Sequence, residues 1–342
     1  MSERSDRWLA GAAARAFPVP IGTPMAGYMA RTGPACGSHD ELTIGAMVIT
    51  REDRRVVIVA ADVAAVDSPL VDEVAAAAGL NRTDLVLCAS HTHGGPAGVV
   101  PRLHPGDDDC GAPALRAAFV ATCAAAIGDA GERLEPVELI FGTSQTTGLA
   151  ANRNDPTGPS DPRLSVLAAR AAGDALGAVL VHFACHPTIL GAESRLVSAD
   201  FPGALRRSLR ASLARNDRAP VVLFANGAAG DVSTRFTRHG QDVAEVERVG
   251  TALASAAIAA LADARPVDGP IVYDRLRVPL PPRSLIEPVA VWPTDFAGEA
   301  SPAAHRQAVT RVQGAVLLAK LVAAGPDAIP PALDLEAWAL GD

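Results

Sequence analysis

The sequence predicts an α/β fold in which a mixed β-sheet core is flanked by alanine-rich helices. Helical and extended patterns alternate along most of the 342 residues, which is typical of that class. Hydrophobic residues make up 49% of the chain and aromatic residues only 4%, so we expect a core of aliphatic side chains. Because we find no internal repeat and no convincing linker, we predict one domain over residues 1–342. The proline-rich stretch 278–293 is the best alternative boundary.

The expected elements follow from hydrophobic periodicity and from turn and capping residues. The predicted strands are residues 44–50, 55–61, 85–88, 138–143, 175–183, 220–224 and 333–339. The predicted helices are residues 71–78, 113–130 and 301–325, one that begins near Pro202 with Asp200 as its cap, and one that begins with the capping box of Asp242 and Glu245. Three arginines of the helix after Pro202 lie opposite leucines, which predicts a solvated face: Arg206, Arg207 and Arg210.

Charge and composition exclude several classes of function. A formal net charge of -8 and a pI near 5.5 argue against a nucleic-acid partner, which requires a concentrated basic face. The five cysteines form no CxxC pair and are expected to be reduced. The N-terminus lacks the apolar segment of a secretory signal, and no uncharged apolar run of about 18 residues is present. We therefore expect a cytoplasmic protein without a transmembrane segment.

The motif His91-Thr92-His93 carries the strongest chemical signal in the chain. It follows the apolar run 85–88 and leads into Gly94 and Gly95. Residues two apart share one face of an extended strand, so both imidazoles can reach one site, and neutral imidazole is a common zinc ligand. The glycines leave room for a substrate.

Four polar features share one context, since each directly follows an apolar strand. They are Asp62, the pair of His91 and His93, His186, and the segment 226–233. Strand ends are where the loops of an α/β protein converge into a pocket. We therefore expect these groups to meet.

Two histidines that hold zinc would predict a hydrolase. Zinc lowers the pKa of its bound water to about 7, which gives a hydroxide nucleophile that can attack a carbonyl substrate. His93 and Arg153 can then stabilise the oxyanion, with Asn226 or the amides of the glycine loop placing the carbonyl group. A Ser-His-Asp mechanism that uses Ser233 is the weaker alternative, because the chain has no Gly-x-Ser-x-Gly elbow.

Together these motifs resemble the N-terminal catalytic domain of the neutral/alkaline non-lysosomal ceramidase family. The resemblance rests on Asp62, on Asn152 and Arg153 with Asp161 and Leu164, and on the segments 25–28, 37–40, 91–96, 183–187, 198–200 and 226–233. These segments follow the order of the family and span most of the chain.

The resemblance implies a zinc-dependent amidase that cleaves the N-acyl bond of ceramide or of a smaller amide. It implies His91 and His186 as zinc ligands, and His93, Arg153 and Ser233 as catalytic groups. The candidate substrate-binding residues are Asp62, Gly95, Asn226 and Asp231.

The chain departs from the family pattern at three places. Gly94 and Thr234 stand where the family usually has serine and proline, and the last residues, Leu340-Gly341-Asp342, precede the family's remaining zinc ligands, a glutamate and a tyrosine. We therefore expect a C-terminally truncated chain. Two alternatives stay open: a non-catalytic remnant that binds a ligand, and a metal hydrolase acting on a non-lipid ester, lactone or amide.

Overall fold

The computed structural model describes residues 7–28, 30–100, 112–215, 218–279 and 332–340. The chain divides into two compact units, one of residues 1–100, 111–272 and 338–342 and one of residues 101–110 and 273–337. The first unit contains every candidate site residue. The predicted helix over 301–325 lies outside the described residues, and the single domain over 1–342 stays a prediction.

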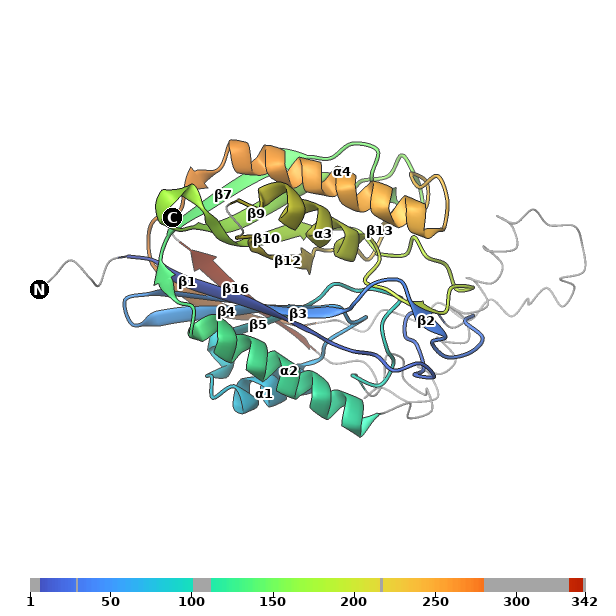
Figure 1. Cartoon of the computed structure of the whole chain (residues 1–342), viewed down its shortest axis with the longest axis horizontal. Coiled ribbons are helices and arrows are strands. Elements are labelled where there is room, and N and C mark those ends of the chain that lie inside the picture. The colour runs from blue at the N-terminus through green and yellow to red at the C-terminus, as the bar shows by residue number, and fades with distance from the viewer. Residues whose placement is uncertain (1–6, 29, 101–111, 216–217, 280–331, 341–342) are drawn as a thin grey trace, which may run out of the picture. The chain divides into compact units, whose positions relative to one another are not determined.

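Two mixed β-sheets form the centre of the first unit, which confirms the predicted fold class (Figure 1). Sheet 1 has the order β5-β4-β3-β1-β6, with strands Leu85–Ala89, Arg54–Ala61, Thr43–Arg51, Leu9–Ala16 and Glu135–Pro136. Sheet 2 has the order β12-β10-β9-β7-β14, with strands Val221–Asn226, Leu176–Phe183, Arg163–Arg170, Glu138–Gln145 and Arg265–Pro266. One pair in each sheet is parallel, β4 with β5 and β10 with β12, and the other pairs are antiparallel.

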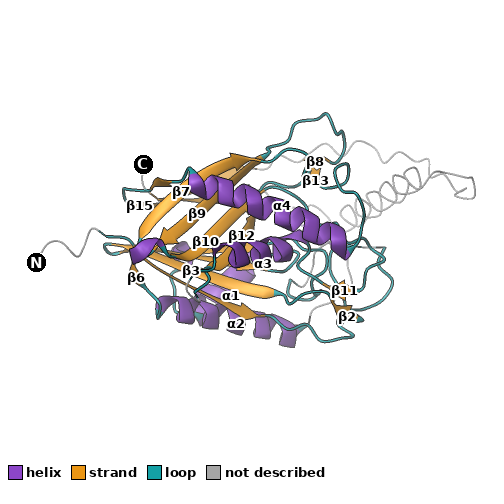
Figure 2. Cartoon of the chain, turned by 45° about the horizontal axis from the view of Figure 1, so that its top comes forward, coloured by secondary structure: helices purple, strands orange, loops and turns teal. Residues whose placement is uncertain are grey.

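The helices cover the outer faces of the two sheets, and the inner faces pack on each other (Figures 1 and 2). α1 (Ser68–Ala77) and α2 (Pro113–Gly131) share a hydrophobic core with sheet 1. α3 (Phe201–Leu213) and α4 (Val243–Ala262) share another with sheet 2. A third core lies between the sheets and includes Met47 and Ile58 of sheet 1 and Leu223 of sheet 2. The first unit is thus a four-layer sandwich.

Short elements complete the structure. Two pairs of short strands, β2 with β11 and β8 with β13, lie in the loops beyond the sheets. These strands are β2 (Gly37–Ser38), β11 (Leu196–Val197), β8 (Ala151–Asn152) and β13 (Val232–Ser233). A further pair consists of β15 (Ile271–Pro279) and β16 (Ala332–Leu340). Two short 3-10 helices cover Arg82–Asp84 and Ala172–Asp174.

Both predicted helix caps form. The Asp200 carboxylate accepts a hydrogen bond from the Phe201 N–H at the start of α3, and that of Asp242 accepts one from the Glu245 N–H in α4. The second half of the predicted capping box is absent, because Glu245 accepts from the His239 N–H and pairs with Arg248 instead.

The strands β1 and β9 were not expected from the sequence. β1 is rich in alanine and has no β-branched residue, so it lacks the composition of a strand. Its small residues serve helix packing: a Cβ at Gly11 would lie 2.2 Å from the carbonyl oxygen of Ala130 in α2. The close approach of α2 to β1 requires glycine there.

Among the described helices, α2 alone is long and apolar enough to cross a membrane, judged by length and composition. Core helices of other proteins meet the same criterion. α2 carries the charged residues Arg116 and Asp129, and it buries Phe119, Cys123 and Ile127 against the rest of its unit.

Candidate metal centre and active site

The candidate site lies where strands of both sheets end. β5 of sheet 1 leads into His91, and β10 and β12 of sheet 2 lead into His186 and Asn226. The Asn226 side chain joins these ends, since its Nδ2 donates to the Ser90 carbonyl at 3.1 Å and its Oδ1 accepts from the Cys185 N–H at 3.1 Å. The polar strand ends therefore converge as predicted.

Three histidines form the centre of the site. One ring nitrogen each of His91, His93 and His186 lies within 4.8 Å of the others. The Nε2 atoms of His91 and His93 are 3.5 Å apart, and the ring centroids of His91 and His186 are 4.5 Å apart. Among the described residues, this cluster is the sole group of three or more side chains placed so that they could hold a metal ion.

Backbone carbonyls orient two of the three rings. The Nδ1 atom of His91 lies 2.6 Å from the carbonyl oxygen of Ala64, and that of His186 lies 2.6 Å from the carbonyl oxygen of Ala229. Because a carbonyl only accepts hydrogen bonds, Nδ1 carries the proton in both rings. Each ring then carries its lone pair on Nε2, which faces the cluster and is the atom through which such a histidine binds a metal.

His91 and His186 are held in different ways. His91 has a positive φ of 67°, an uncommon conformation for a residue with a side chain, and its N–H donates to the Val63 carbonyl. His186 is buried, and its N–H donates to Val232 in a short bridge with Ser233. His91 thus combines a positive φ with the 2.6 Å contact between its Nδ1 and the Ala64 carbonyl.

Burial keeps His93 and His186 uncharged. Burial, followed by the neighbouring His91 and His186, lowers the pKa of His93 to about 3. Burial, followed by His91 and Arg153, lowers the pKa of His186 to about 4. Both rings are therefore neutral at pH 7, as metal ligation requires. Neutral imidazole nitrogens fit a zinc ion by donor type.

The segment after β1 encloses His93. The Tyr28 ring packs against the His93 ring at a centroid distance of 4.8 Å, and a Cβ at Gly27, where φ is +95°, would lie 2.4 Å from the His93 ring. The Arg31 guanidinium donates to the carbonyls of Ala26, His93 and Ser194. The Nδ1 atom of His93 is buried without a described hydrogen-bond partner.

Ser233 ends β13, and Arg153 directly follows β8, the strand that pairs with β13 beside His186. The Arg153 N–H donates to the Asp231 carbonyl at 2.6 Å, and the Asn152 side chain donates to the Asp231 carboxylate at 3.0 Å. The Arg153 guanidinium has no hydrogen-bond partner among the described residues, and its charge contributes to the low pKa of both His93 and His186. The Ser233 hydroxyl accepts from the Arg235 N–H at 3.2 Å.

Asp62 lies near the site but its carboxylate is engaged elsewhere. The side chain is 1% exposed, accepts from the Thr43 N–H, and forms a bidentate ion pair with Arg206 of α3. The predicted solvated face is therefore wrong for Arg206, because its guanidinium is largely buried against the Asp62 carboxylate, directly after β4. Substrate binding by Asp62 stays a prediction without a free carboxylate oxygen to support it.

Gly95 is buried in the turn after the histidines. Its carbonyl accepts from the Ala26 N–H, and a Cβ at this position would lie 3.3 Å from the Asp62 carbonyl oxygen. The structure thus brings together His91, His93, His186, Asn226, Arg153 and Ser233 and places Gly95 and Asp231 beside them. Arg31 was not expected from the sequence. The Ala64 and Ala229 carbonyls could not be expected either, because every residue has a backbone carbonyl and no residue type marks these two.

Comparisons with known proteins agree with this geometry. The family model described as neutral/alkaline non-lysosomal ceramidase, N-terminal, matches residues 18–248. The neutral ceramidase from Pseudomonas aeruginosa shares the fold with a TM-score of 0.71 and 21% identity, over 80% of this chain and 48% of that chain. A ceramidase complexed with C2 shares it with a TM-score of 0.77 and 19% identity, over 98% and 62%. A search of curated proteins gave no match.

The resemblance expected from the motifs is thereby confirmed. The matched region contains every candidate site residue, and the chain spans less than two thirds of the length of either solved structure. The chain belongs to the neutral/alkaline non-lysosomal ceramidase family and corresponds to its N-terminal part.

Proposed function

We propose that this chain is the zinc-binding part of an amidohydrolase that cleaves the N-acyl bond of ceramide or of a smaller amide. The observation that carries the proposal is the pair of His91 and His186, whose Nδ1 protons are fixed on carbonyls, so that both rings offer an Nε2 lone pair to the cluster. Family membership supports the type of reaction. The solved relative that is a ceramidase complexed with C2 supports a lipid amide as substrate.

His91 and His186 would hold the zinc ion through Nε2. When bound, zinc supplies the Lewis acidity that makes water nucleophilic at neutral pH. The family resemblance implies a glutamate and a tyrosine as further zinc ligands.

Arg153 and His93 are suited to bind the amide carbonyl oxygen. The guanidinium of Arg153 is free of described partners, and charge-assisted hydrogen bonds become stronger as negative charge develops on that oxygen. His93 is neutral at pH 7 and has no acceptor at Nδ1, so the tautomer with the proton on Nε2 leaves no buried N–H unpaired. Its Nε2–H can then donate to the substrate.

The remaining predicted groups support substrate placement. Ser233 uses a hydroxyl lone pair for the Arg235 N–H, so its proton is available to the substrate. Asn226 keeps the strand ends together, and Asp231 holds the Arg153 backbone. Among the described residues no histidine ring forms a hydrogen bond with the Ser233 hydroxyl, so metal-dependent hydrolysis is favoured over a serine nucleophile.

The test is zinc titration of the full chain by calorimetry, combined with assays on ceramide, a short N-acyl amide and a matched ester. We expect one zinc per chain and release of the fatty acid from an amide. Zinc binding with turnover of the ester alone would instead favour the ester hydrolase, and stoichiometric ligand binding without zinc would favour the non-catalytic remnant.

The role of His93 is separable from that of His91. We expect His91→Ala to lose zinc binding and His93→Ala to retain it while losing turnover. Loss of zinc from both variants would make His93 a third ligand, a geometry that the 3.5 Å separation of the two Nε2 atoms also permits.

A further inference from the structure

The segment 198–200 lies between the two loops that carry the metal-binding histidines. On one side, the Ser198 N–H donates to the Gly94 carbonyl at 3.0 Å, and the Ser198 carbonyl accepts from the Thr92 hydroxyl at 2.6 Å. The same hydroxyl accepts from the Gly94 N–H at 3.0 Å. Thr92 is fully buried between the two histidines of the motif. Its hydroxyl therefore fixes the His91-Thr92-His93 loop on Ser198.

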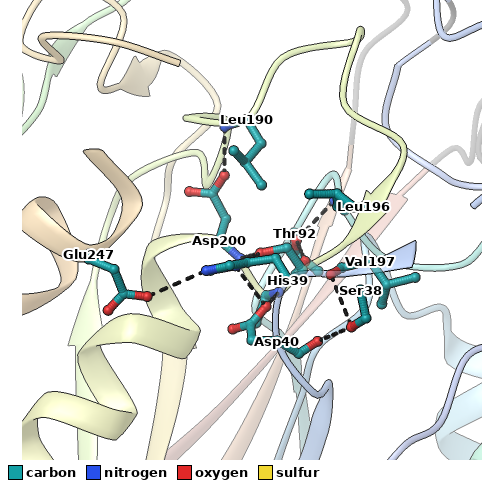
Figure 3. A network of polar contacts seen from close by, with 12 residues as sticks. Ser38, His39, Asp40, Thr92, Leu190, Leu196, Val197, Asp200 and Glu247 are labelled. Carbon is teal, nitrogen blue, oxygen red and sulfur yellow. Dashed lines mark hydrogen bonds and ion pairs between the residues drawn. The ribbon is translucent and has the colours of Figure 1, made fainter. Parts of the chain in front are cut away.

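Asp200 makes the matching contact to the other loop. One carboxylate oxygen accepts from the Leu190 N–H at 3.0 Å, four residues after His186, and the other accepts from the Phe201 N–H at 2.8 Å (Figure 3). Asp200 is 2% exposed, so few waters can replace these partners. The Leu190 carbonyl accepts from Tyr28, which packs on His93.

A second set of side chains, those of Asp40, Ser198 and His39, also fixes the segment 198–200. The Asp40 carboxylate accepts from the Ala199 N–H at 2.9 Å, and the Ser198 hydroxyl accepts from the Asp200 N–H at 2.9 Å. His39 lies beside Asp40 (Figure 3), and its Nδ1 is 3.0 Å from the Ser198 hydroxyl. Because Ser198 is fully buried, this contact between a serine and a histidine is structural rather than nucleophilic.

The backbone of Asp200 shows that its position is over-determined. Its φ of 59° and ψ of -151° lie in a region that is essentially restricted to glycine. Such a conformation costs on the order of 1–3 kcal/mol and persists where surrounding contacts fix it. Glycine would relieve the strain, but it has no carboxylate to reach the Leu190 N–H.

From these contacts we propose that the segment 198–200 sets the relative position of the two metal-binding loops, with Thr92 and Asp200 as positioning residues. Neither side chain is placed to touch the metal or the substrate. The inference rests on the proposed function, since it concerns the affinity of the zinc site.

The test compares the dissociation constant of zinc in full-length variants by calorimetry, with thermal unfolding measured on the same samples. Thr92→Val removes one hydroxyl at nearly constant shape, and Asp200→Gly relieves the backbone while removing the carboxylate. Glycine at an N-cap costs only about a few tenths of a kcal/mol relative to aspartate, so α3 should remain. We expect zinc affinity to fall about 10-fold in each variant, and Thr92→Ser to restore it.

Two matched controls separate positioning from general stability. Thr146→Val also removes a buried threonine hydroxyl that donates to a backbone carbonyl, that of Pro162, and Asp242→Gly also removes a helix cap. Both should keep the wild-type affinity for zinc. Unchanged affinity in Thr92→Val and Asp200→Gly, or an equal loss in the controls, would overturn this inference alone. A wild-type chain that binds no zinc would overturn it together with the proposed function.

Discussion

The two helical layers of the sandwich cover similar sheets but differ in how they relate to the site. The cap and first turns of α3 contact segments that flank the site: Asp200 contacts Leu190, Arg206 contacts Asp62, and Arg207 contacts Asp40. The charged residues of α2 make mainly partly exposed pairs, Arg116 with Glu73 and Asp129 with Arg15. The layer on sheet 2 thus supports the chemistry, whereas the layer on sheet 1 mainly covers the core.

The largest expected effect lies on the sheet 2 side of the site. His186→Ala should weaken zinc binding by at least about 100-fold, because it removes a ligand and ligand-supporting residues alone account for about 10- to 100-fold. Cys185→Ala is the matched control, since the fully buried Cys185 side chain is not in the histidine cluster and, besides its packing, makes only a 3.6 Å contact from its thiol to the His186 carbonyl. Calorimetric titration measures both. Equal zinc retention in the two variants would show that His186 is not a ligand.

The comparison of the helical layers is tested most directly at Arg206. Arg206→Met should lower the free energy of unfolding by about 3 kcal/mol, because it leaves the Asp62 carboxylate, which is 1% exposed, without its countercharge. Urea unfolding measures the change. A loss below about 1 kcal/mol would mean that the ion pair behaves like an exposed one, and the proposed difference between the layers would fail.

The histidines predict a pH dependence of the zinc-free protein. Histidine has an ordinary pKa of 6.5, and burial lowers the pKa of His93 to about 3 and that of His186 to about 4. Between these values the unfolded chain binds more protons than the folded one, so the free energy of unfolding falls as pH falls from about 6.5 to about 4, by up to about 1.4 kcal/mol per pH unit for each histidine.

The double variant His93→Gln/His186→Gln is the control for this effect. It should flatten the dependence on pH within the same window when urea unfolding is repeated at each pH. An equally steep loss of stability in the double variant would assign the acid sensitivity to carboxylates elsewhere in the chain.

The smallest effect is expected on α2. Arg116→Met removes a pair with Glu73, whose side chain is 48% exposed, and a hydrogen bond to the Val99 carbonyl. The free energy of unfolding should fall by no more than about 1 kcal/mol, and zinc affinity should not change. A change in zinc affinity would show that the α2 layer also acts on the site.

Strands with continuous apolar runs and helices with clear caps were predictable from the sequence, as β4, β5, β10 and α4 show. β1 was not, because its alanines and glycine serve packing against α2 rather than strand propensity. His91 and His186 could be selected as candidate ligands from the sequence because imidazole is a common metal ligand and both follow apolar strands. The carbonyls that orient them, and the bond from Arg206 to Asp62, depend on tertiary contacts between segments far apart in sequence.

The Asn226 side chain closes the seam between the two sheets with a single planar group. This position requires a side chain with one acceptor and one donor side by side. Aspartate has nearly the same shape but no donor, so its carboxylate would place a negative charge against the Ser90 carbonyl. A metal ion held by His91 on one side of that seam and His186 on the other would act as a cross-link between the sheets. Removing it should then loosen this end of the sandwich before either hydrophobic layer separates.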